Sequence, residues 1–280
     1  MFPYRILITG SDDLASATAL RLFRSGFKVA LLAPDRPIDI HHIRTFSSAV
    51  YNGEKTIEQV TACTRSGSVE KGDNRPETTL NAFLEYTFAN RRIPVLTEED
   101  FVGAPVLNFD YIFLAVRELF KKLPGYLKEN SILISKWNDK ITGLSRYQIC
   151  DDSIYRGRVI YPFNKERFVD CGKLIKETNS EEKVKAPLEG VFTTNTAVDS
   201  IIHEKQELGR INDIPILAPC SGKISGLLNS GLIIPAGTVF AEICSVTNPE
   251  PVKLISAASF SVAGAVLEAI LYDLSLNENS

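Results

Sequence analysis

Apolar residues in the first part of the chain form two short runs separated by a helical stripe. Tyr4 to Thr9 is an apolar run of strand length, and the polar turn Gly10-Ser-Asp-Asp follows it. Within Asp13 to Ser25 the apolar residues recur at helical spacing, and Gly26 suits the left-handed position after a helix end. Phe27 to Leu32 is the second run. This order predicts two parallel strands joined by a right-handed crossover.

Later apolar runs extend the pattern to an open α/β sheet. Residues 79–90 are predicted to form a helix, and Ile93 to Leu96 a short strand. The run from Asp110 to Val116 is apolar and aromatic, as expected of a strand buried on both faces, and Ile132 to Ser135 is similar. We therefore expect a Rossmann-like open parallel sheet over residues 1–136.

A connecting segment is expected over residues 137–183, and beyond it the pattern changes. Short β-prone runs punctuated by Gly and Pro predict an all-β module over residues 184–250. Within it, Ala186-Pro-Leu-Glu-Gly-Val recurs 32 residues later as Ala218-Pro-Cys-Ser-Gly-Lys. Each copy leads through a further strand towards a glycine, at Gly209 and Gly237. Two copies of one small β unit would bury a shared core that neither could bury alone.

The last segment, residues 251–280, is predicted to form a strand and a helix that packs back on the body. Its apolar residues fall at helical spacing, at Ala263, Val266, Leu267, Ile270, Leu271 and Leu274. Leu254 to Leu274 is the most apolar stretch of the chain. It contains three serines, Glu268 and Asp273, so we do not expect a membrane span there.

The composition is that of an ordinary soluble chain of 280 residues, 44% hydrophobic and 23% charged. A net charge of −3 offers no attraction for phosphate backbones or anionic lipid, so neither nucleic acid nor a membrane is an expected partner. The N-terminus MFPYRILITG is typical of a strand rather than a signal peptide, which predicts a cytoplasmic protein. Five scattered cysteines without a C-x-x-C pair, and three histidines, predict neither a disulfide framework nor a metal site.

The repeat, with G-L-I-I-P-A-G-T-V-F-A-E-I after its second copy, resembles the biotinyl/lipoyl-like barrel-sandwich-hybrid fold. Carriers of that fold present a modified lysine on the hairpin between their two halves. Here the corresponding tip is Glu207 to Ile214, which contains no lysine. The resemblance therefore implies a β module with a structural or docking role rather than a carrier.

Nearly the whole chain resembles the YqeB-type accessory proteins of selenium-dependent molybdenum hydroxylases. The matching pieces, in order, are ITGSDDLASATALRLFRSGFKV at 8–29, FSSAVYNGE at 46–54, GRVIY at 157–161, KAPLEGVF at 185–192, ILAPCSGKISGLL at 216–228 and AGAVLEAIL at 263–271. The resemblance implies a role in hydroxylase maturation, with the molybdenum hydroxylase or its maturation machinery as partner. It also implies that the N-terminal sheet binds a nucleotide-bearing or molybdopterin-type cofactor. It indicates no oligomeric state.

Four positions depart from the family pattern. Asp12 stands at the second glycine of the family's opening turn, where a close phosphate approach would want no side chain. His41-His42 replaces an Arg pair, Leu114-Ala115 replaces an acidic residue followed by Ala, and ISKWNDKITGLSRYQI at 134–149 replaces a Gly-rich loop. These departures leave open a non-catalytic scaffold homologue whose ligand site has decayed.

The first candidate binding residues lie after a strand and before a helix. They are Gly10, Ser11, Asp12, Asp13 and Leu14. In this position the free N–H groups of a helix N-terminus can meet an anion. An ordinary helix cap explains the same residues without a ligand. Asp35, which lies 25 residues after Gly10, fits either a contact to a ribose hydroxyl or a turn.

His41, His42 and Arg44 form a second candidate set. In the crevice at the carboxyl end of the sheet they would gather an anionic group, whereas as exposed loop residues they would have no such role. Two adjacent histidines without a third ligand do not predict a metal site. Tyr51 and Glu54 lie in the best-matching piece, where they either shape the pocket or form a turn.

No catalytic residue is predicted, and the sequence leaves open whether the chain is an enzyme. Cys63 and Cys220 are candidates for sulfur transfer, but neither has a neighbouring His or basic run, and buried apolar packing also explains them. The alternative function is an NAD(P)-dependent oxidoreductase that uses the same crevice. The missing second glycine and the lack of an evident acid/base partner count against it.

Overall fold

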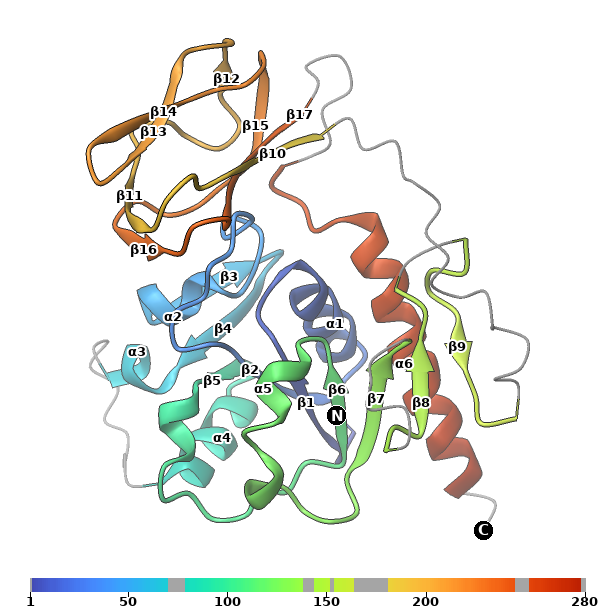
Figure 1. Cartoon of the computed structure of the whole chain (residues 1–280). Helices are drawn as coiled ribbons and strands as arrows, with labels where there is room; N and C mark the ends of the chain where they lie inside the picture. The colour runs from blue at the N-terminus through green and yellow to red at the C-terminus, as the bar shows by residue number, and fades with distance from the viewer. Residues whose placement is uncertain are drawn as a thin grey trace. The chain divides into compact units, whose positions relative to one another are not determined.

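The computed structural model describes residues 2–69, 79–137, 144–151, 154–163, 181–244 and 252–277. The chain forms two compact units. The first comprises residues 1–37, 46–175 and 255–280, and the second comprises residues 38–45 and 176–254. A mixed sheet with helices builds the first unit, and two antiparallel sheets build the second (Figure 1). The fold is therefore mixed α/β, and no single cut in the sequence separates its two parts.

The first unit is built on a nine-stranded sheet in the order β3-β4-β5-β2-β1-β6-β7-β8-β9. Neighbours from β4 to β8 in this order pair in parallel, and the edge strands β3 and β9 pair antiparallel. The strands are β1 Arg5–Thr9, β2 Lys28–Leu32, β3 Glu54–Ile57, β4 Val60–Thr64, β5 Ile93–Leu96, β6 Tyr111–Leu114, β7 Ile132–Lys136, β8 Tyr147–Ile149 and β9 Val159–Ile160. Since β2 and β6 flank β1, the order reverses there. Open α/β sheets bind ligands outside the carboxyl ends of strands near such a reversal.

The strands predicted from apolar runs are present in this sheet. β1 and β2 pair in parallel and are joined by α1 (Asp13–Arg24), which confirms the predicted parallel pair and its connecting helix. Gly26 has φ +94°, which confirms its left-handed position. The strands expected at 93–96, 110–116 and 132–135 are β5, β6 and β7. The structure adds β3, β4, β8 and β9, for which the weaker apolar pattern gives no prediction, so the sheet extends beyond residue 136.

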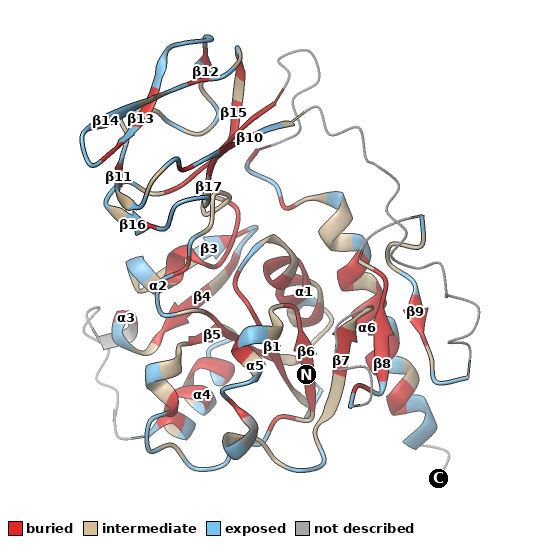
Figure 2. Cartoon of the chain, viewed as in Figure 1, coloured by how far each residue is buried: buried red, intermediate tan, exposed pale blue. Residues whose placement is uncertain are grey.

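Helices cover both faces of this sheet. On one face α1 and α6 (Ala257–Asn277) pack against Ile6 and Ile8, and on the other α4 (Leu80–Ala89) and α5 (Arg117–Phe120) pack against Leu7. Because side chains alternate across a strand, neighbours on β1 enter different cores. The central strands are buried almost throughout (Figure 2). The shorter helical segments are α2 Ser48–Asn52, α3 Arg65–Val69, η1 Glu98–Phe101 and η2 Pro124–Tyr126.

A buried carboxylate anchors α6 to the sheet. Asp273 is fully buried, accepts hydrogen bonds from Tyr111 Oη at 3.0 Å and Tyr147 Oη at 2.8 Å, and pairs with Arg146 Nε at 3.0 Å. The predicted apolar stripe supplies the buried face, including Ala263, Val266, Ile270 and Leu274. Within the described residues, α6 alone is long and apolar enough to cross a membrane. Buried core helices meet the same criteria, so this is weak evidence for a span.

The strand predicted before α6 is absent from the described residues 252–256, which form a turn and a short irregular segment. Ser256 precedes the helix, and its Oγ accepts a hydrogen bond from Ser259 N at 3.1 Å. A serine in this position satisfies a free N–H group of the first helical turn. The polar residues that interrupt the apolar run at this point therefore start the helix rather than extend a strand.

The second unit contains two four-stranded antiparallel sheets, β10-β17-β15-β12 and β14-β13-β11-β16. The strands are β10 Glu181–Lys185, β11 Gly190–Thr193, β12 Ile201–Ile202, β13 Glu207–Ile211, β14 Ile214–Leu217, β15 Gly222–Leu227, β16 Leu232–Ile234 and β17 Val239–Cys244. β11 pairs with β13 and β16, and its repeat counterpart β15 pairs with β17 and β12. Each half of the repeat thus contributes strands to both sheets. This arrangement confirms the internal repeat and its shared core.

The two glycines expected at equivalent points of the repeat, Gly209 and Gly237, are not equivalent. The counterpart of Gly237 is Lys205, and both residues have positive φ, +81° and +65°. Lys205 N donates to Ala218 O at 2.9 Å, as Gly237 N donates to Ala186 O at 2.8 Å. Glycine spacing misled the prediction because one copy of this turn accommodates a lysine.

The hairpin between the two halves ends in a two-residue turn at Asn212 and Asp213, which have φ +47° and +66°. The Asn212 side chain is bound to β11 and to the residue before it. Its Oδ1 accepts from Val191 N at 2.9 Å, and its Nδ2 donates to Glu189 O at 3.1 Å. A Cβ on Gly190 would lie 2.2 Å from Asn212 Nδ2, which explains the glycine of the first A-P-x-x-G copy. The hairpin tip is therefore part of the folded module.

Candidate functional site

The N-terminus of α1, the first predicted ligand site, is capped by the chain itself. Asp12 is the N-cap residue, and its Oδ1 accepts a hydrogen bond from Ala15 N at 3.0 Å. Gly10 has φ +121°, and a Cβ there would lie 3.0 Å from Val116 Cγ2. Backbone conformation and packing therefore require glycine at position 10 without reference to a ligand.

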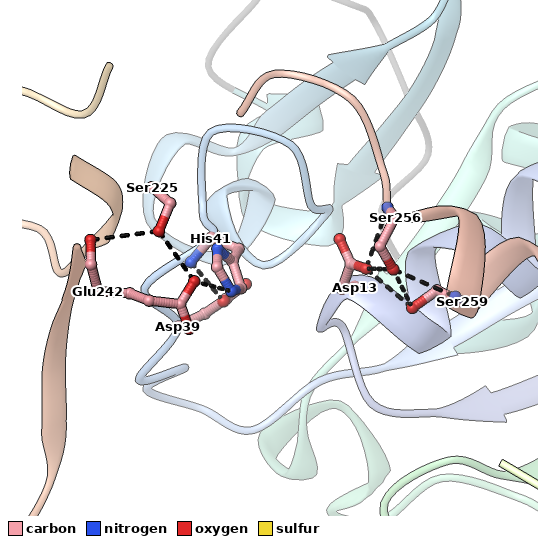
Figure 3. Close-up of polar contacts among 7 residues, drawn as sticks. All are labelled: Asp13, Asp39, His41, Ser225, Glu242, Ser256 and Ser259. Carbon is pink, nitrogen blue, oxygen red and sulfur yellow. Dashed lines mark hydrogen bonds and ion pairs between the residues drawn. The ribbon is translucent and has the colours of Figure 1, made fainter. Parts of the chain in front are cut away.

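Asp13 joins the start of α1 to the start of α6 (Figure 3). Its Oδ2 accepts hydrogen bonds from Ser256 Oγ at 2.6 Å, Ser259 Oγ at 2.8 Å and Ser256 N at 3.3 Å. The other two predicted residues of this turn also face inward, since Ser11 is buried and Leu14 packs against the core. The polar atoms of this turn thus make contacts within the first unit.

These contacts place two carboxylates where a dinucleotide would bring its phosphates. A helix N-terminus favours an anion because its N–H groups and its dipole present positive charge. Here Asp12 and Asp13 already supply that anion. A phosphate at the same place would face two like charges. The residues present fit a helix cap and do not fit a pyrophosphate group.

A cavity of about 550 Å³ opens at the carboxyl ends of β2, β4 and β5. We call it the sheet-edge cavity, and its lining residues are Asp35, Val50, Thr64, Arg65, Ser66, Thr97, Glu99 and Asp100. Its volume lies within the range of about 300–1,000 Å³ that is typical of small-molecule sites. Of the candidate binding residues predicted from the sequence, Asp35 lines it.

Two glycines shape one wall of the sheet-edge cavity. Thr64 N and Thr64 Oγ1 both donate to Gly53 O, at 2.8 Å and 3.1 Å. A Cβ on Gly53, which has φ +77°, would lie 2.5 Å from Gly67 Cα. Gly67 N donates to Thr64 Oγ1 at 3.2 Å. This close backbone crossing fixes the start of α3, which carries Arg65 and Ser66 along the cavity.

Tyr51 and Glu54, which the sequence marks as candidates for shaping a pocket, do not line the sheet-edge cavity. Tyr51 Oη donates to Pro37 O at 2.7 Å and so holds the chain just after Asp35. Burial raises the pKa of Tyr51, although Arg36 opposes the shift. Glu54 Oε2 lies 3.6 Å from Arg92 Nη1. Tyr51 therefore contacts the segment that follows Asp35 without lining the cavity.

Backbone groups fix two of the carboxylates in the sheet-edge cavity. Asp35 Oδ1 accepts from Glu98 N at 3.0 Å, and Asp100 Oδ2 accepts from Thr97 N at 2.9 Å in the capping box that opens η1. Burial raises the pKa of Asp100; the Thr97 hydrogen bonds and Arg65 oppose the shift, whereas the Asp35 carboxylate adds to it. Glu99 is exposed. The cavity thus presents several carboxylate oxygens and one guanidinium.

His41, His42 and Arg44 belong to the second unit, whereas Gly10 to Leu14 and Asp35 belong to the first. Arg44 is buried, and its N donates to His41 O at 2.9 Å. The candidate residues are thus distributed over three places: the start of α1, the sheet-edge cavity and the turn at 38–45.

An aspartate organises the turn at 38–45. Asp39 Oδ1 accepts from His41 N at 2.8 Å, and Asp39 Oδ2 accepts from Thr45 Oγ1 at 2.5 Å. His41 Nε2 lies 3.8 Å from Glu242 Oε1, which also accepts a hydrogen bond from Ser225 Oγ at 3.0 Å (Figure 3). Glu242 is buried in β17. A protonated His41 would therefore pair with a buried carboxylate of the same unit.

The cysteines give no support to thiol chemistry. Burial raises the pKa of Cys220 and of Cys244, and neighbouring glutamates act in the same direction. Because the thiolate is the nucleophile, these two thiols are poor sulfur carriers at neutral pH. Cys63 is buried in β4. Cys150 is disulfide-bonded, a cross-link that the cysteine spacing does not predict.

A metal centre is not evident in the part of the chain that the structure describes. No group of three or more His, Cys, Asp or Glu side chains in that part could hold a metal ion.

Sequence reasoning missed most of the sheet-edge cavity. Thr97-Glu-Glu-Asp100 directly follows the predicted strand at 93–96, and its T-x-x-D spacing is close to that of a capping box. Polar residues in this position could have predicted part of the cavity, because ligands bind at the carboxyl ends of parallel strands. Thr64 ends β4 and Arg65 and Ser66 follow it, and the apolar pattern does not predict this strand.

The chain was compared with family models, with curated proteins and with solved structures. No family model matches it. It is 26% identical over 269 residues to the uncharacterized protein YqeB of Escherichia coli strain K12, a match that covers 95% of this chain and 47% of YqeB. The chain therefore spans about half the length of this curated relative. The match agrees with the resemblance to YqeB-type proteins, and the relative's description assigns no function.

A solved structure of an aspartoacylase family protein from Mesorhizobium loti aligns with 86% of this chain and 84% of its own chain. The sequence identity is 13% and the TM-score is 0.25. A superposition of this quality carries no argument about fold or function.

Proposed function

We propose that this chain is an accessory protein for maturation of a molybdenum hydroxylase, and that its sheet-edge cavity holds a pterin or a guanine-type base of the cofactor. We interpret the first unit as Rossmann-like and the second as barrel-sandwich-hybrid-like. The maturation role rests on the motif resemblance to YqeB-type proteins; the 26% identity to YqeB supports that resemblance and says nothing of the role. The ligand class rests on the cavity itself.

The observation that carries the ligand class is the gathering of Asp35, Glu99 and Asp100 at the carboxyl end of the sheet. An ionised carboxylate only accepts hydrogen bonds. A pterin or a guanine presents a ring N–H beside an exocyclic amino group, so that one edge carries adjacent donors. Such an edge complements a carboxylate. Arg65 on the same cavity suits the phosphate end of the cofactor.

An NAD(P)-dependent oxidoreductase is the weaker alternative. Its cofactor would bring a pyrophosphate to the start of α1, where Asp12 and Asp13 stand. Its adenine offers a donor beside an acceptor, and a carboxylate can satisfy only the donor. Both features favour a ligand with a donor-rich edge that is bound away from α1.

Calorimetric titration of the purified chain with pterin, guanosine, adenosine and NADH tests the ligand class. Pterin or guanosine is expected to bind, and adenosine and NADH are expected to bind at least tenfold more weakly. Glu99→Gln removes a charge from an exposed cavity residue and should weaken pterin binding about tenfold, since a charge-assisted hydrogen bond contributes about 1.5–3 kcal/mol. Glu129→Gln, an exposed glutamate outside the cavity, is the matched control.

Equal affinity for adenosine and guanosine, or equal losses in the two variants, would contradict the proposed base recognition. The maturation role needs a separate test. Cells that lack the gene should contain hydroxylase protein with little activity, and the gene should restore that activity. Normal hydroxylase activity in those cells would refute the role while leaving the binding result intact.

A further inference from the structure

The second unit contains a cavity of about 540 Å³ that is separate from the sheet-edge cavity in its lining residues. We call it the β-module cavity. It is lined by His42, Ile43, Thr194, Thr196, Ala197, Val198, Leu227, Leu228, Asn229, Ser230 and Lys253, all of which belong to the second unit. Its existence and its lining therefore do not depend on the first unit.

The repeat builds two walls of the β-module cavity. The loop at 194–198 follows β11 in the first copy of the repeat. Its counterpart in the second copy includes the segment at 227–230, which begins at the last residue of β15. The two walls are hydrogen-bonded to each other, because Thr194 N donates to Ser230 Oγ at 3.2 Å. Thr194 Oγ1 in turn donates to Leu208 O at 2.8 Å and accepts from Thr196 N at 3.0 Å. These contacts hold the walls in place without a ligand.

The turn at 38–45 supplies a third wall, with His42 and Ile43. It is fixed to the β module by Leu227 N, which donates to Ile40 O at 2.8 Å. A Cβ on Gly226 would lie 3.0 Å from Ile40 Cδ1, so glycine at this position allows the turn to approach β15 closely. The Ile40 side chain packs against the core of the module. His42 is thereby held at the cavity by contacts within one unit.

The lining of the β-module cavity combines apolar and basic side chains. Ile43, Val198, Leu227 and Leu228 supply apolar surface, and the charged or titratable residues of the lining are Lys253 and His42. No carboxylate belongs to the described lining. Asp199, which follows Val198, pairs with Lys223, with Oδ1 and Nζ 2.5 Å apart. The Lys223 hydrogen bond lowers the pKa of Asp199, and the positive charge of Lys253 acts in the same direction.

We infer that the β-module cavity binds a small amphiphilic anion, with its carboxylate or phosphate head beside Lys253 and His42 and its apolar body against Leu227 and Leu228. A neutral molecule of the same shape would gain the apolar contacts without the charge interaction. A cation would meet like charge. The volume of the cavity falls in the range that holds small molecules.

Titration of the full chain with octanoate, octyl phosphate, octanol and octylamine tests this inference. Both anions are expected to bind, octanol at least tenfold more weakly, and octylamine not measurably. The order of octanoate and octyl phosphate identifies the preferred head group. Lys253→Gln should weaken octanoate binding about tenfold, and Lys183→Gln, at an exposed lysine of β10 outside the cavity, should leave it unchanged.

Ala197→Trp provides a second variant, since Ala197 is exposed at the cavity and a large side chain there would fill it. It should abolish octanoate binding while the melting temperature stays near that of the wild type. Octanoate binding that is undetectable in the wild type, matched by octanol, or unchanged by Lys253→Gln would overturn the inference. Glu99→Gln should leave octanoate binding unchanged, so this result is independent of the sheet-edge cavity.

Discussion

The Asp13 carboxylate accepts a hydrogen bond from Ser256 Oγ at 2.6 Å, although 243 residues separate them in the sequence. One carboxylate thus lies in the first turn of α1 and also satisfies the start of α6. Negative charge stabilises both helix N-termini through their dipoles. Asp13, which belongs to the turn predicted to meet a ligand, therefore joins two helices on one face of the sheet.

Replacing Asp13 with Ala should destabilise the first unit. The change removes the acceptor of hydrogen bonds from Ser256 Oγ, Ser256 N and Ser259 Oγ. We expect the free energy of unfolding in urea to fall by about 1–3 kcal/mol. Asp13→Asn keeps an acceptor oxygen and should lose less. If the Asp13→Ala variant has the same urea midpoint of unfolding as the wild type, the contact between α1 and α6 through Asp13 does not contribute to stability.

Gly53→Ala should be far more destabilising than Gly103→Ala. Both glycines have positive φ, +77° and +72°, but a Cβ on Gly53 would lie 2.5 Å from Gly67 Cα whereas one on Gly103 meets nothing within 4 Å. We expect a loss of about 1 kcal/mol for Gly103→Ala and about 2–4 kcal/mol for Gly53→Ala, measured by thermal unfolding. Similar losses in the two variants would show that the Gly53–Gly67 crossing is not tightly packed.

Asp100→Asn should gain stability relative to the wild type as the pH rises. Burial raises the folded-state pKa of Asp100 above the ordinary 3.8. The folded chain then holds the proton more tightly than the unfolded chain does, so the stability contributed by the neutral carboxyl is lost as the pH rises through the folded pKa. The asparagine can still accept the hydrogen bond from Thr97 N.

The measurement for Asp100→Asn is urea unfolding of both proteins from pH 4 to pH 8. The variant-minus-wild-type difference in unfolding free energy should increase over this interval. Glu129→Gln reports the general effect of removing one surface carboxylate. A difference that decreases with pH would mean that the cavity stabilises the charged form of Asp100.

Lys205→Gly should leave the β module unchanged or stabilise it by about 0.5 kcal/mol. Lys205 has φ +65° at the place where the other repeat copy has Gly237. Glycine would remove the strain of a side chain in the left-handed conformation, and its cost is the greater conformational entropy of the unfolded chain. The lysine side chain is 82% exposed and has little packing to lose. The reverse change, Gly237→Lys, should destabilise by about 1 kcal/mol. Thermal unfolding that ranks the two variants in the opposite order would contradict the equivalence of these turns.

The fold was predictable where apolar runs are uniform. β1, β2, β5, β6 and β7 are buried strands flanked by turns, and their run length alone indicates them. β8 and β9 are two or three residues long, which is below the length at which a period can be recognised. The insertion of segment 38–45 into the second unit was also unpredictable. Its contacts to β15 involve residues nearly two hundred positions away, which no local pattern encodes.

The candidate site was less predictable for a related reason. Gly10 to Asp13 have the sequence context of a phosphate-binding turn, but only the contacts of Asp13 with Ser256 and Ser259 distinguish a helix joint from a ligand site. Asp35 was identified from its distance along the chain after Gly10. Its partners Glu99 and Asp100 follow another strand, and the strand order that brings them to one cavity appears only in the folded sheet.

Our proposal places the ligand in the sheet-edge cavity and not at the start of α1. Hydrogen exchange of the purified chain with and without pterin distinguishes the two places. We expect slower exchange at residues 64–67 and at Thr97 and Glu98, whose amides donate to Asp100 and Asp35, and unchanged exchange at residues 10–15. Slower exchange at residues 10–15, without a change at the cavity, would contradict it.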